Sequence, residues 1–340
     1  MPVTPHRNNL TQPDLADSIK AEALRLGFSS AGIADGAALS HRRRELSAWL
    51  ARGLAGPLDY MRDFFDRQAR FLQRLPEPRS VIVLAAPYAG QPEPAPATAQ
   101  ACGQVARYAV GEDYHRVIRK QLKQLETFIR RRVGPEARIL TAVDTSPIQE
   151  KALAEAAGLG FIGKNTCLIH PRQGSYLFLG ALLTNLDLPA DPPIAWDCGN
   201  CTLCLQACPT HALVGPYQMD ASRCIATLTI ELRGDIDPAL RPQMGTWLFG
   251  CDICQQVCPY NRPDPKKNPS HLPLETILSE QSDSSSSSDA IESLNYRFGA
   301  RRCNDSYIGS SSVCRFFHLL WNIHFERIED FYCSEFLCRS

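Results

Sequence analysis

The sequence lacks three features that would place it in a specialised class of protein. It has no excess of charge, since 36 lysines and arginines balance 36 aspartates and glutamates, so overall charge does not indicate nucleic-acid binding. It contains no apolar run long enough to cross a membrane. The first residues, Met1 to Asn9, are polar and lack the apolar core of a secretory signal. We therefore expect a cytoplasmic protein that is not membrane-bound.

Cysteine, in contrast, is plentiful, with 14 residues in the chain. One run contains Cys198, Cys201, Cys204 and Cys208 and ends in Pro209. This C-x2-C-x2-C-x3-C-P spacing is typical of bacterial two-cluster ferredoxins, in which the fourth cysteine ligates the other cluster. The run therefore predicts three ligands for one iron–sulfur cluster and one ligand for a second.

A second run repeats this spacing without its first member. It contains Cys251, Cys254 and Cys258 before Pro259, and Cys224 further upstream can supply the missing thiol. The sequence thus predicts two 4Fe–4S clusters with these ligands: Cys198, Cys201, Cys204 and Cys258 for one, and Cys208, Cys224, Cys251 and Cys254 for the other. Zinc is the alternative, although two runs that end in Cys-Pro suit it poorly. Disulfides are disfavoured because the spacings are short and no secretory signal is present.

The residues before the cysteine runs alternate between predicted helices and strands. We expect helices over 14–26, 40–52, 113–133 and 146–157, strands over 80–86 and 138–143, and paired strands over 166–169 and 176–184. This pattern indicates an α/β (α+β) domain, which is more than a bare electron carrier requires and favours an enzyme. The predicted organisation is a flexible N-terminus over 1–11, a catalytic domain over 12–190, a ferredoxin-like domain over 191–265 and an irregular, partly low-complexity tail over 266–340.

Several segments together resemble the epoxyqueuosine reductases, the cobalamin-dependent iron–sulfur enzymes of tRNA queuosine synthesis. The matching segments are RYAVGEDYH at 107–115, VDTSP at 143–147, GLGFIGKN at 158–165, GSYLFL at 174–179 and both cysteine runs. The resemblance extends from about residue 12 to residue 265. It implies a monomeric enzyme that reduces the epoxide of epoxyqueuosine at the tRNA wobble position, giving queuosine and water. Electrons from an external low-potential donor would pass through both clusters to cobalt.

The resemblance also implies which residues act. Asp144 would be the proton donor, and the cobalamin contacts would be Asp144, Gly163, Lys164, Asn165, Leu168 and Leu179. The sequence alone favours a loop or capping role for Asp144, and only the resemblance favours an acid; the segment around Lys164 could equally be a tight turn. The Asp-x-His-x-x-Gly motif that supplies histidine to cobalt begins at Asp113 and His115, but Ile118 replaces its glycine. We therefore expect a structural role for His115, and cobalamin with its own base displaced and no protein ligand.

Two other functions remain possible at this point. A corrinoid reductive dehalogenase of small organohalides would use similar cofactors, although such enzymes typically carry an export signal. A ferredoxin-like electron-transfer protein would explain the cysteines but not the roughly 190 residues before them. Candidate tRNA contacts are the basic runs Arg42–Arg44, Arg130–Arg132 and Lys266–Lys267.

Overall fold

The structure is a computed structural model of the chain, and it describes residues 11–88 and 103–262. All of these residues belong to one compact unit. Within them, no helix is both long and apolar enough to span a membrane. Nearly all of the predicted N-terminal segment and tail lies outside the described residues. Thr11, the last residue of that N-terminal segment, caps the first helix, because its hydroxyl accepts a hydrogen bond from the Asp14 N–H.

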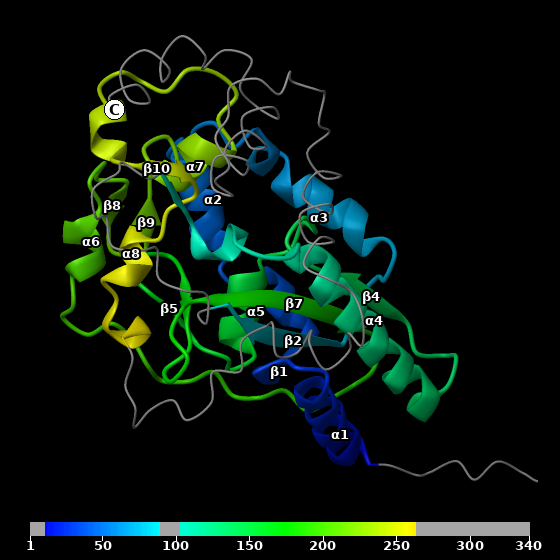
Figure 1. Ribbon diagram of the computed structural model, residues 1–340. Coiled ribbons are helices and arrows are strands. Elements are labelled where there is room, and N and C mark those ends of the chain that lie inside the picture. Colours follow the sequence, from blue (N-terminus) through cyan, green and yellow to red (C-terminus); the bar gives the residue numbers. More distant parts are fainter. Residues whose placement is uncertain (1–10, 89–102, 263–340) are drawn as a thin grey trace, which may run out of the picture. The chain divides into compact units, whose positions relative to one another are not determined.

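A four-stranded antiparallel sheet forms the centre of the first region, with the order β1-β2-β7-β4 (Figure 1). Its strands are β1 (Ser30–Asp35), β2 (Ser80–Pro87), β4 (Ile139–Ala142) and β7 (Leu177–Thr184). Strand β7 is the last of the four in the chain, yet it pairs with β2 on one side and β4 on the other. The two eight-residue strands are apolar almost throughout, as expected for strands buried on both faces.

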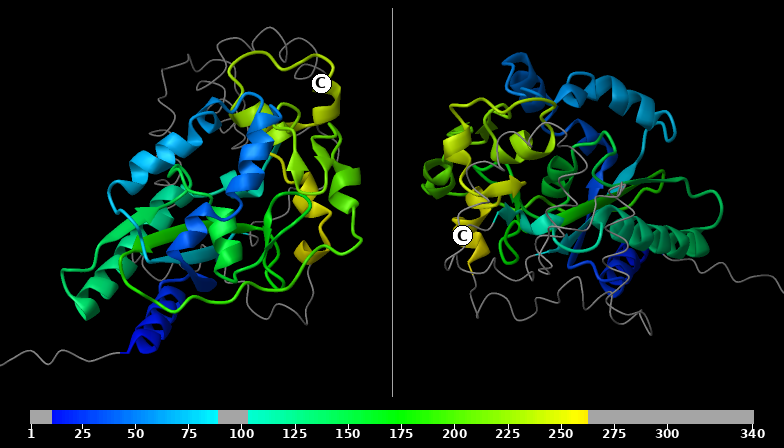
Figure 2. Two further views of the ribbon diagram at one scale, coloured as in Figure 1. Left: turned by 180° about the vertical axis from the view of Figure 1, so that it is seen from behind. Right: turned by 45° about the horizontal axis from the view of Figure 1, so that its top comes forward.

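Helices cover both faces of this sheet (Figure 2). The helices of this region are α1 (Gln12–Arg25), α2 (Arg43–Ala51), α3 (Phe64–Leu72), α4 (Tyr114–Val133) and α5 (Glu150–Ala156). Because side chains alternate along a strand, Ile82 and Leu84 pack with α1 and α4, whereas Val81 and Val83 pack with α5. At Gly180, a Cβ atom would lie 2.8 Å from Ile118 Cγ2, so α4 approaches β7 more closely than a larger residue allows.

The second region, which carries the cysteine runs, consists of short elements around turns. They are β3 (Gln104–Val105), β5 (Phe161–Ile162), β6 (Leu168–Ile169), α6 (Leu203–Ala207), β8 (Leu213–Gly215), β9 (Gln218–Met219), α7 (Ile225–Ile230), β10 (Trp247–Phe249) and α8 (Ile253–Gln256). A small apolar core gathers around Trp247, Ile225 and Ala106. Strand β10 runs parallel to β3, and this pairing joins the second region to the segment that precedes α4.

The structure confirms the mixed α/β layer and most of the predicted helices and strands, with two exceptions. The predicted pairing of 166–169 with 176–184 is wrong, because β6 pairs with β5 while β7 enters the centre of the sheet. The helix predicted to begin at Ser146 begins at Glu150 instead. Ser146 Oγ accepts a hydrogen bond from the Val143 N–H at 3.4 Å, so this serine shapes a turn rather than a helix N-terminus.

Candidate functional site

Four cysteines from two distant segments line one pocket. Cys198, Cys201 and Cys204 come from the loop that leads into α6, and Cys258 follows α8. These are the four thiols that the sequence assigns to the first cluster, so the fold brings the predicted set together although Cys204 and Cys258 are 54 positions apart in the chain.

The other four predicted ligands also lie close to one another. Burial, with smaller contributions from the nearby Cys224, Asp252 and Cys208, raises the pKa of Cys251 to about 12. A hydrogen bond with Cys167, together with burial, raises the pKa of Cys254, and its neighbours Cys251 and Cys224 add to that rise. Thiols that are crowded in this way hold their protons until a metal displaces them, as expected for metal ligands.

The arrangement of the thiols suits clusters better than single metal ions. Within residues 11–88 and 103–262, no three His, Cys, Asp or Glu side chains converge closely enough to hold one metal ion. Zinc draws each of its four ligands to within about 2.0–2.3 Å, which requires such convergence. Thiols spread around a pocket instead fit a 4Fe–4S cluster, in which each iron takes one thiolate. The assignment of each cysteine to one cluster stays a prediction.

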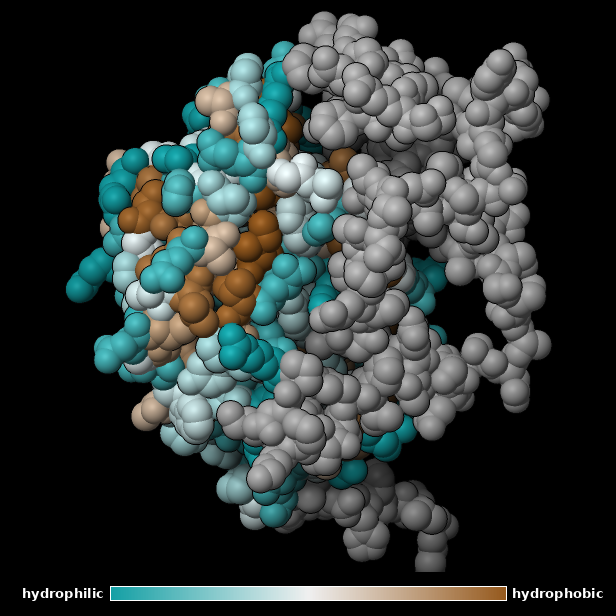
Figure 3. Space-filling view, turned by 60° about the vertical axis from the view of Figure 1, so that its left-hand side comes forward, coloured by the Kyte–Doolittle hydropathy of each residue, from teal (hydrophilic) through white to brown (hydrophobic). Residues whose placement is uncertain are grey.

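Hydrophobic side chains surround the outer part of the cysteine region. They gather on the face of the molecule that carries α6 and β8 (Figure 3), where Leu203 and Val214 are 40% and 46% exposed. Leu203 directly precedes Cys204 and lines the first pocket. The three thiols of the loop before α6 are therefore partly exposed, whereas Cys258, which completes the same set, is buried.

The turn between β5 and β6, residues 163–167, is here called the bridging turn because it contacts both cysteine loops. On one side, Lys164 Nζ donates hydrogen bonds to the carbonyl oxygens of Gly199 at 2.6 Å and Cys201 at 2.9 Å. The Lys164 backbone N–H also points to Cys198 Sγ at 3.4 Å. A positive charge and an N–H donor thus lie beside the first set of thiols.

On its other side, the bridging turn contacts the second set through Asn165, which is only 3% exposed. Asn165 Nδ2 donates to the carbonyl oxygen of Cys254 at 3.3 Å, and Asn165 Oδ1 accepts the N–H of Cys167 at 3.2 Å. Gly163 is closely packed, because a Cβ there would lie 2.4 Å from Ile169 Cδ1 and 2.7 Å from Asn165 Oδ1, so a larger residue would displace these side chains. One five-residue turn therefore links the two cysteine loops.

The residues predicted to contact cobalamin lie in different surroundings: some bind the cysteine loops and others pack in the core of the sheet region. Lys164 and Asn165 bind the cysteine loops through their side chains, as described above. Leu168 is buried in the core on the α5 side of the sheet, and Leu179 packs against the same core. The contact of Cys167 with Cys254 was not anticipated, because it arises from the β5–β6 hairpin and not from any cysteine spacing. The only sequence signal for a role of Cys167 is its position next to the predicted site residues Lys164 and Asn165.

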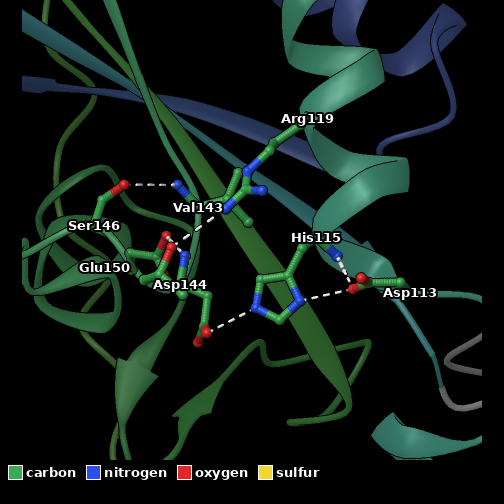
Figure 4. A network of polar contacts seen from close by, with 8 residues as sticks. Asp113, His115, Arg119, Val143, Asp144, Ser146 and Glu150 are labelled. Carbon is green, nitrogen blue, oxygen red and sulfur yellow. Dashed lines mark hydrogen bonds and ion pairs between the residues drawn. The ribbon is translucent and has the colours of Figure 1, made fainter. Parts of the chain in front are cut away.

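Asp144 lies in the loop between β4 and α5 and is held at several points (Figure 4). Its backbone is left-handed, with φ of 47°, a conformation that costs a residue other than glycine roughly 1–2 kcal/mol. Its N–H donates to Glu150 Oε1 at 2.8 Å, and Arg119 bonds the neighbouring Thr145 hydroxyl at 3.3 Å. Its carboxyl group is half exposed and lies 2.8 Å from His115 Nε2. These contacts stabilise the loop in a conformation that leaves the Asp144 carboxyl group accessible from solvent.

His115 connects Asp144 to a second carboxylate. Its Nδ1 lies 2.7 Å from Asp113 Oδ1, so both ring nitrogens are engaged (Figure 4). The ring stacks on Tyr114 at 4.0 Å between centroids, and Tyr114 stacks in turn on Phe178 at 4.2 Å. His115 lies in the first turn of α4 as expected, but the prediction of a purely structural role misses this contact with the candidate proton donor.

Aromatic and acidic side chains from separate segments surround Asp144. Burial raises the pKa of Tyr60, Tyr108 and Tyr114, and the charge of Asp144 raises all three further. Burial and the Asp144 charge likewise raise the pKa of Glu231, which follows α7 in the cysteine region. Asp144 therefore faces both regions of the molecule across a largely aromatic surface. Sequence reasoning did not identify Tyr60 or Glu231, because no motif links them to Asp144.

Glu150 is a second acid beside the loop. Burial raises its pKa to about 8, and the negative charge of Asp144 adds to this rise. A carboxyl group with this pKa is mostly protonated at neutral pH. Because Glu150 accepts the backbone N–H of Asp144, it supports the loop without meeting the Asp144 carboxyl group directly.

Two of the basic runs are partly committed to contacts within the protein. Arg42 forms an ion pair with Glu155 at 2.5 Å, and Arg130 forms one with Glu126 at 2.9 Å. The third run, Lys266–Lys267, lies outside the described residues.

Comparison with known families and structures gives consistent matches. A family model described as "4Fe-4S double cluster binding domain" matches residues 197–261, and one described as "Epoxyqueuosine reductase QueG, DUF1730" matches residues 69–145. The epoxyqueuosine reductase of Pseudomonas aeruginosa is 45% identical over 264 residues, which cover 76% of this chain and 73% of that protein. That of Gloeobacter violaceus is 48% identical over 249 residues, covering 72% and 76% of the respective chains.

Solved structures agree with these relatives. The epoxyqueuosine reductase of Streptococcus thermophilus superposes with a TM-score of 0.65 at 32% identity, covering 73% of this chain and 66% of that one. A structure of an epoxyqueuosine reductase with an epoxyqueuosine-modified tRNA-Tyr stem loop gives a TM-score of 0.64 at 33% identity, covering 73% and 65%. The chain thus spans about two thirds of the length of these solved proteins.

The α/β layer, the double-cluster region and these matches define an iron–sulfur oxidoreductase. The chain belongs to the epoxyqueuosine reductase family. Three predictions from the sequence are confirmed: the family, the fold class and the assignment as an oxidoreductase.

Proposed function

We propose that this chain reduces epoxyqueuosine at the wobble position of tRNA to queuosine, with release of water. Membership of the family supports this function, and a related enzyme has been solved with an epoxyqueuosine-modified tRNA stem loop. The observation that carries the proposal is the placement of Asp144. Its carboxyl group is half exposed, bonded to His115, and close enough to Glu231 of the cysteine region to raise the pKa of that glutamate.

Two 4Fe–4S clusters would carry electrons toward this site. Cys198, Cys201, Cys204 and Cys258 are proposed to hold one cluster, and Cys208, Cys224, Cys251 and Cys254 the other. An external low-potential donor would reduce one of these clusters, which would pass the electrons to the second. The bridging turn lies against both sets of thiols, because the Lys164 N–H contacts Cys198 and the Asn165 side chain contacts Cys254.

Cobalamin is the proposed third cofactor, and when bound it supplies a low-valent cobalt able to act as a strong nucleophile or reductant. The aromatic surface of Tyr60, Tyr108 and Tyr114 beside Asp144 suits a flat macrocycle with an apolar face. Gly163, Lys164 and Asn165 would contact it through backbone groups, because the side chains of the latter two already bind the cysteine loops. Leu168, Leu179 and Asp144 complete the proposed contacts.

No protein ligand to the cobalt is proposed, and the base of the cofactor would be displaced. His115 is the nearest histidine to Asp144, and both of its ring nitrogens are engaged by carboxylates. A metal bond to His115 would require it to give up one of these contacts.

Asp144 is proposed as the proton donor. Opening an epoxide puts negative charge on its oxygen, so an acid at hydrogen-bonding distance lowers the barrier. The left-handed backbone and the bonds from Glu150 and His115 hold the carboxyl group ready for this role. A related enzyme from Bacillus subtilis has been solved with an aspartate-bearing catalytic loop swung out of the active site, which agrees with a loop that can release.

The proposal also covers the oligomeric state, the location in the cell and the domain boundaries of the chain. The chain would act as a monomer in the cytoplasm, where tRNA is available. The division into a catalytic domain over 12–190 and a ferredoxin-like domain over 191–265 also stays a proposal. Residues 187–198, between the last sheet strand and α6, contain no helix or strand, which is compatible with such a boundary.

Mass spectrometry of tRNA tests this function. The full chain, loaded with iron, sulfide and cobalamin and reduced chemically, should remove one oxygen mass from tRNA that contains epoxyqueuosine. Asp144→Asn should keep the iron–sulfur and corrin absorption but lose turnover by about 10²–10⁴-fold. Asp187→Asn, which alters an exposed aspartate paired with Arg79, is the matched control and should keep full activity. Full turnover in Asp144→Asn would exclude Asp144 as the acid, and a loaded wild-type chain that leaves the oxygen in place would exclude the function.

A further inference from the structure

The proposed reaction consumes more protons than one carboxyl group holds. Removing the epoxide oxygen as water breaks both carbon–oxygen bonds, forms a carbon–carbon double bond, and consumes two electrons and two protons. The electrons would come through the clusters. Asp144 carries one proton, so a second proton must reach the same oxygen within one turnover. The inference drawn here rests on the proposed function and concerns the source of that second proton.

His115 is in direct contact with the Asp144 carboxyl group. Its Nε2 lies 2.8 Å from Asp144 Oδ2, and its Nδ1 lies 2.7 Å from Asp113 Oδ1 (Figure 4). The three side chains form a continuous chain of hydrogen bonds, carboxyl–imidazole–carboxyl. The His115 side chain is 27% exposed and that of Asp113 31% exposed, so water can replenish a proton that leaves the ring.

The other titratable groups around Asp144 are less suited to this task. Glu150 bonds the Asp144 backbone N–H, so it faces the main chain and not the carboxyl group. The Tyr114 phenol also hydrogen-bonds the Asp144 carboxyl group, but its pKa, like those of Tyr60 and Tyr108, is raised by burial and by the Asp144 charge, which makes all three phenols weak acids. Arg119 bonds the Thr145 hydroxyl group, and Glu231 acts on Asp144 through its charge; among the described residues neither is seen to hydrogen-bond the Asp144 carboxyl group.

We propose that His115 reloads Asp144 with the second proton and that Asp113 orients the imidazole. In the protonated ring, Nδ1–H is donated to Asp113 and Nε2–H to Asp144. Asp144 gives its proton to the opening epoxide oxygen and becomes an acceptor. The Nε2 proton then passes to Asp144 Oδ2, and Asp144 delivers it as the oxygen leaves as water. Asp144 is left as a carboxylate and His115 as neutral imidazole, still bonded to Asp113 through Nδ1–H. Two protons from solvent, one to Asp144 and one to His115 Nε2, restore the starting state.

The packing of His115 supports a fixed position for this transfer. Asp113 is the N-cap of α4, and its carboxylate accepts both the backbone N–H and the ring Nδ1 of His115. The ring is also held face to face against Tyr114. Proton transfer depends on such short, stable donor–acceptor distances.

Single-turnover kinetics with the loaded, chemically reduced full chain tests the relay. The substrate is tRNA that contains epoxyqueuosine, and loss of one oxygen mass is followed over time across a range of pH. His115→Gln keeps a polar side chain but cannot carry a proton, and His115→Ala leaves room for free imidazole. Both should slow the reaction by about 10–10³-fold, at the lower end of the effect of losing an acid–base group. Added imidazole should restore the rate of His115→Ala, and Asp113→Asn should slow the reaction less.

Controls separate the relay from a structural role and from the function itself. His41→Gln alters an exposed histidine paired with Glu155 and should leave the rate unchanged. Each variant should retain the iron–sulfur and corrin spectra of the wild type. A wild-type rate and pH profile in His115→Gln would overturn the relay, as would a slow His115→Ala that imidazole does not restore. If the wild-type chain itself fails to remove the oxygen, the proposed function fails, and that result is distinct from the loss of the relay.

Discussion

The two regions of the molecule are stabilised in different ways. The sheet region has four paired strands of up to eight residues, a 20-residue helix, and two apolar cores in which Ile82, Leu84 and Leu182 are fully buried. The cysteine region has helices of four to six residues, strands of two or three, and one small core around Trp247. Helices this short are not stable by themselves. Backbone order in the cysteine region therefore depends on its ligands, and order in the sheet region on apolar packing.

This difference has a functional meaning. A region that closes around cofactors must be able to open so that the clusters can be inserted, and weak intrinsic structure permits this. A region that holds a strained acid such as Asp144 must be rigid, because left-handed backbone persists only where the surroundings enforce it. Three substitutions test the comparison, and the largest effect is expected first.

Cys258→Ser should have the largest effect because it removes a proposed ligand that closes the first cluster. We expect loss of about half of the bound iron, together with faster hydrogen exchange over the cysteine region and little change over the sheet. Cys167→Ser is the matched control, since Cys167 contacts Cys254 but belongs to neither proposed set. Iron analysis measures the loss of metal, and mass spectrometry measures hydrogen exchange in each region. Full iron in Cys258→Ser, or iron loss in Cys167→Ser, would show that the ligand sets are wrong.

Leu182→Ala should destabilise the sheet region without removing iron. Leu182 is fully buried in β7, in the apolar core that α1 and α4 share with the sheet, and such truncations cost about 2–5 kcal/mol in the free energy of unfolding. Denaturation of the loaded protein in urea measures the change. Leu203→Ala, on the surface of the cysteine region, should change the free energy by less than about 0.5 kcal/mol. Equal losses in the free energy of unfolding for the two substitutions would refute the proposal that the two regions are stabilised in different ways.

Lys164→Met should have the smallest effect, a lower reduction potential of the first cluster. The Lys164 ammonium group lies beside the carbonyls of Gly199 and Cys201, where its charge favours the more negative, reduced cluster. Removing it should lower that potential by on the order of tens of millivolts. Lys151→Met is the control, because Lys151 bonds Thr166 in the same turn but not the first cysteine loop. A redox titration followed by electron paramagnetic resonance should show a shift in Lys164→Met alone; equal shifts in both variants would indicate a general effect of charge.

The parts of the structure that follow from local rules could be predicted from the sequence. The grouping of Cys198, Cys201 and Cys204 follows from their spacing, and α4 follows from its apolar periodicity. The partner of β7 could not be read locally, because an apolar strand reveals that it is buried but not which strands lie beside it. The turn at Ser146 was mistaken for a helix start, since serine before proline favours both.

In the candidate site, too, single residues could be predicted from nearby sequence, but contacts between distant segments could not. Asp144 was identified through the resemblance of the segment around it, and its place after β4 agrees with the predicted strand. Its contact with His115 required knowledge of how α4 crosses the sheet, and its nearness to Tyr60 and Glu231 required the fold of both regions. The side chains of Lys164 and Asn165 turned toward the cysteine loops for the same reason: the hairpin that carries them packs there.

The central place of β7 has a consequence for biosynthesis. Both neighbours of β7, β2 and β4, leave the ribosome before it does, and β4 has no other partner in the sheet. Until Thr184 has emerged, the nascent polypeptide can pair β1 with β2 but exposes an apolar, unpaired edge of β2. Slow translation or a shortage of chaperones at this stage should therefore favour aggregation of the newly made chain, before any cofactor becomes relevant.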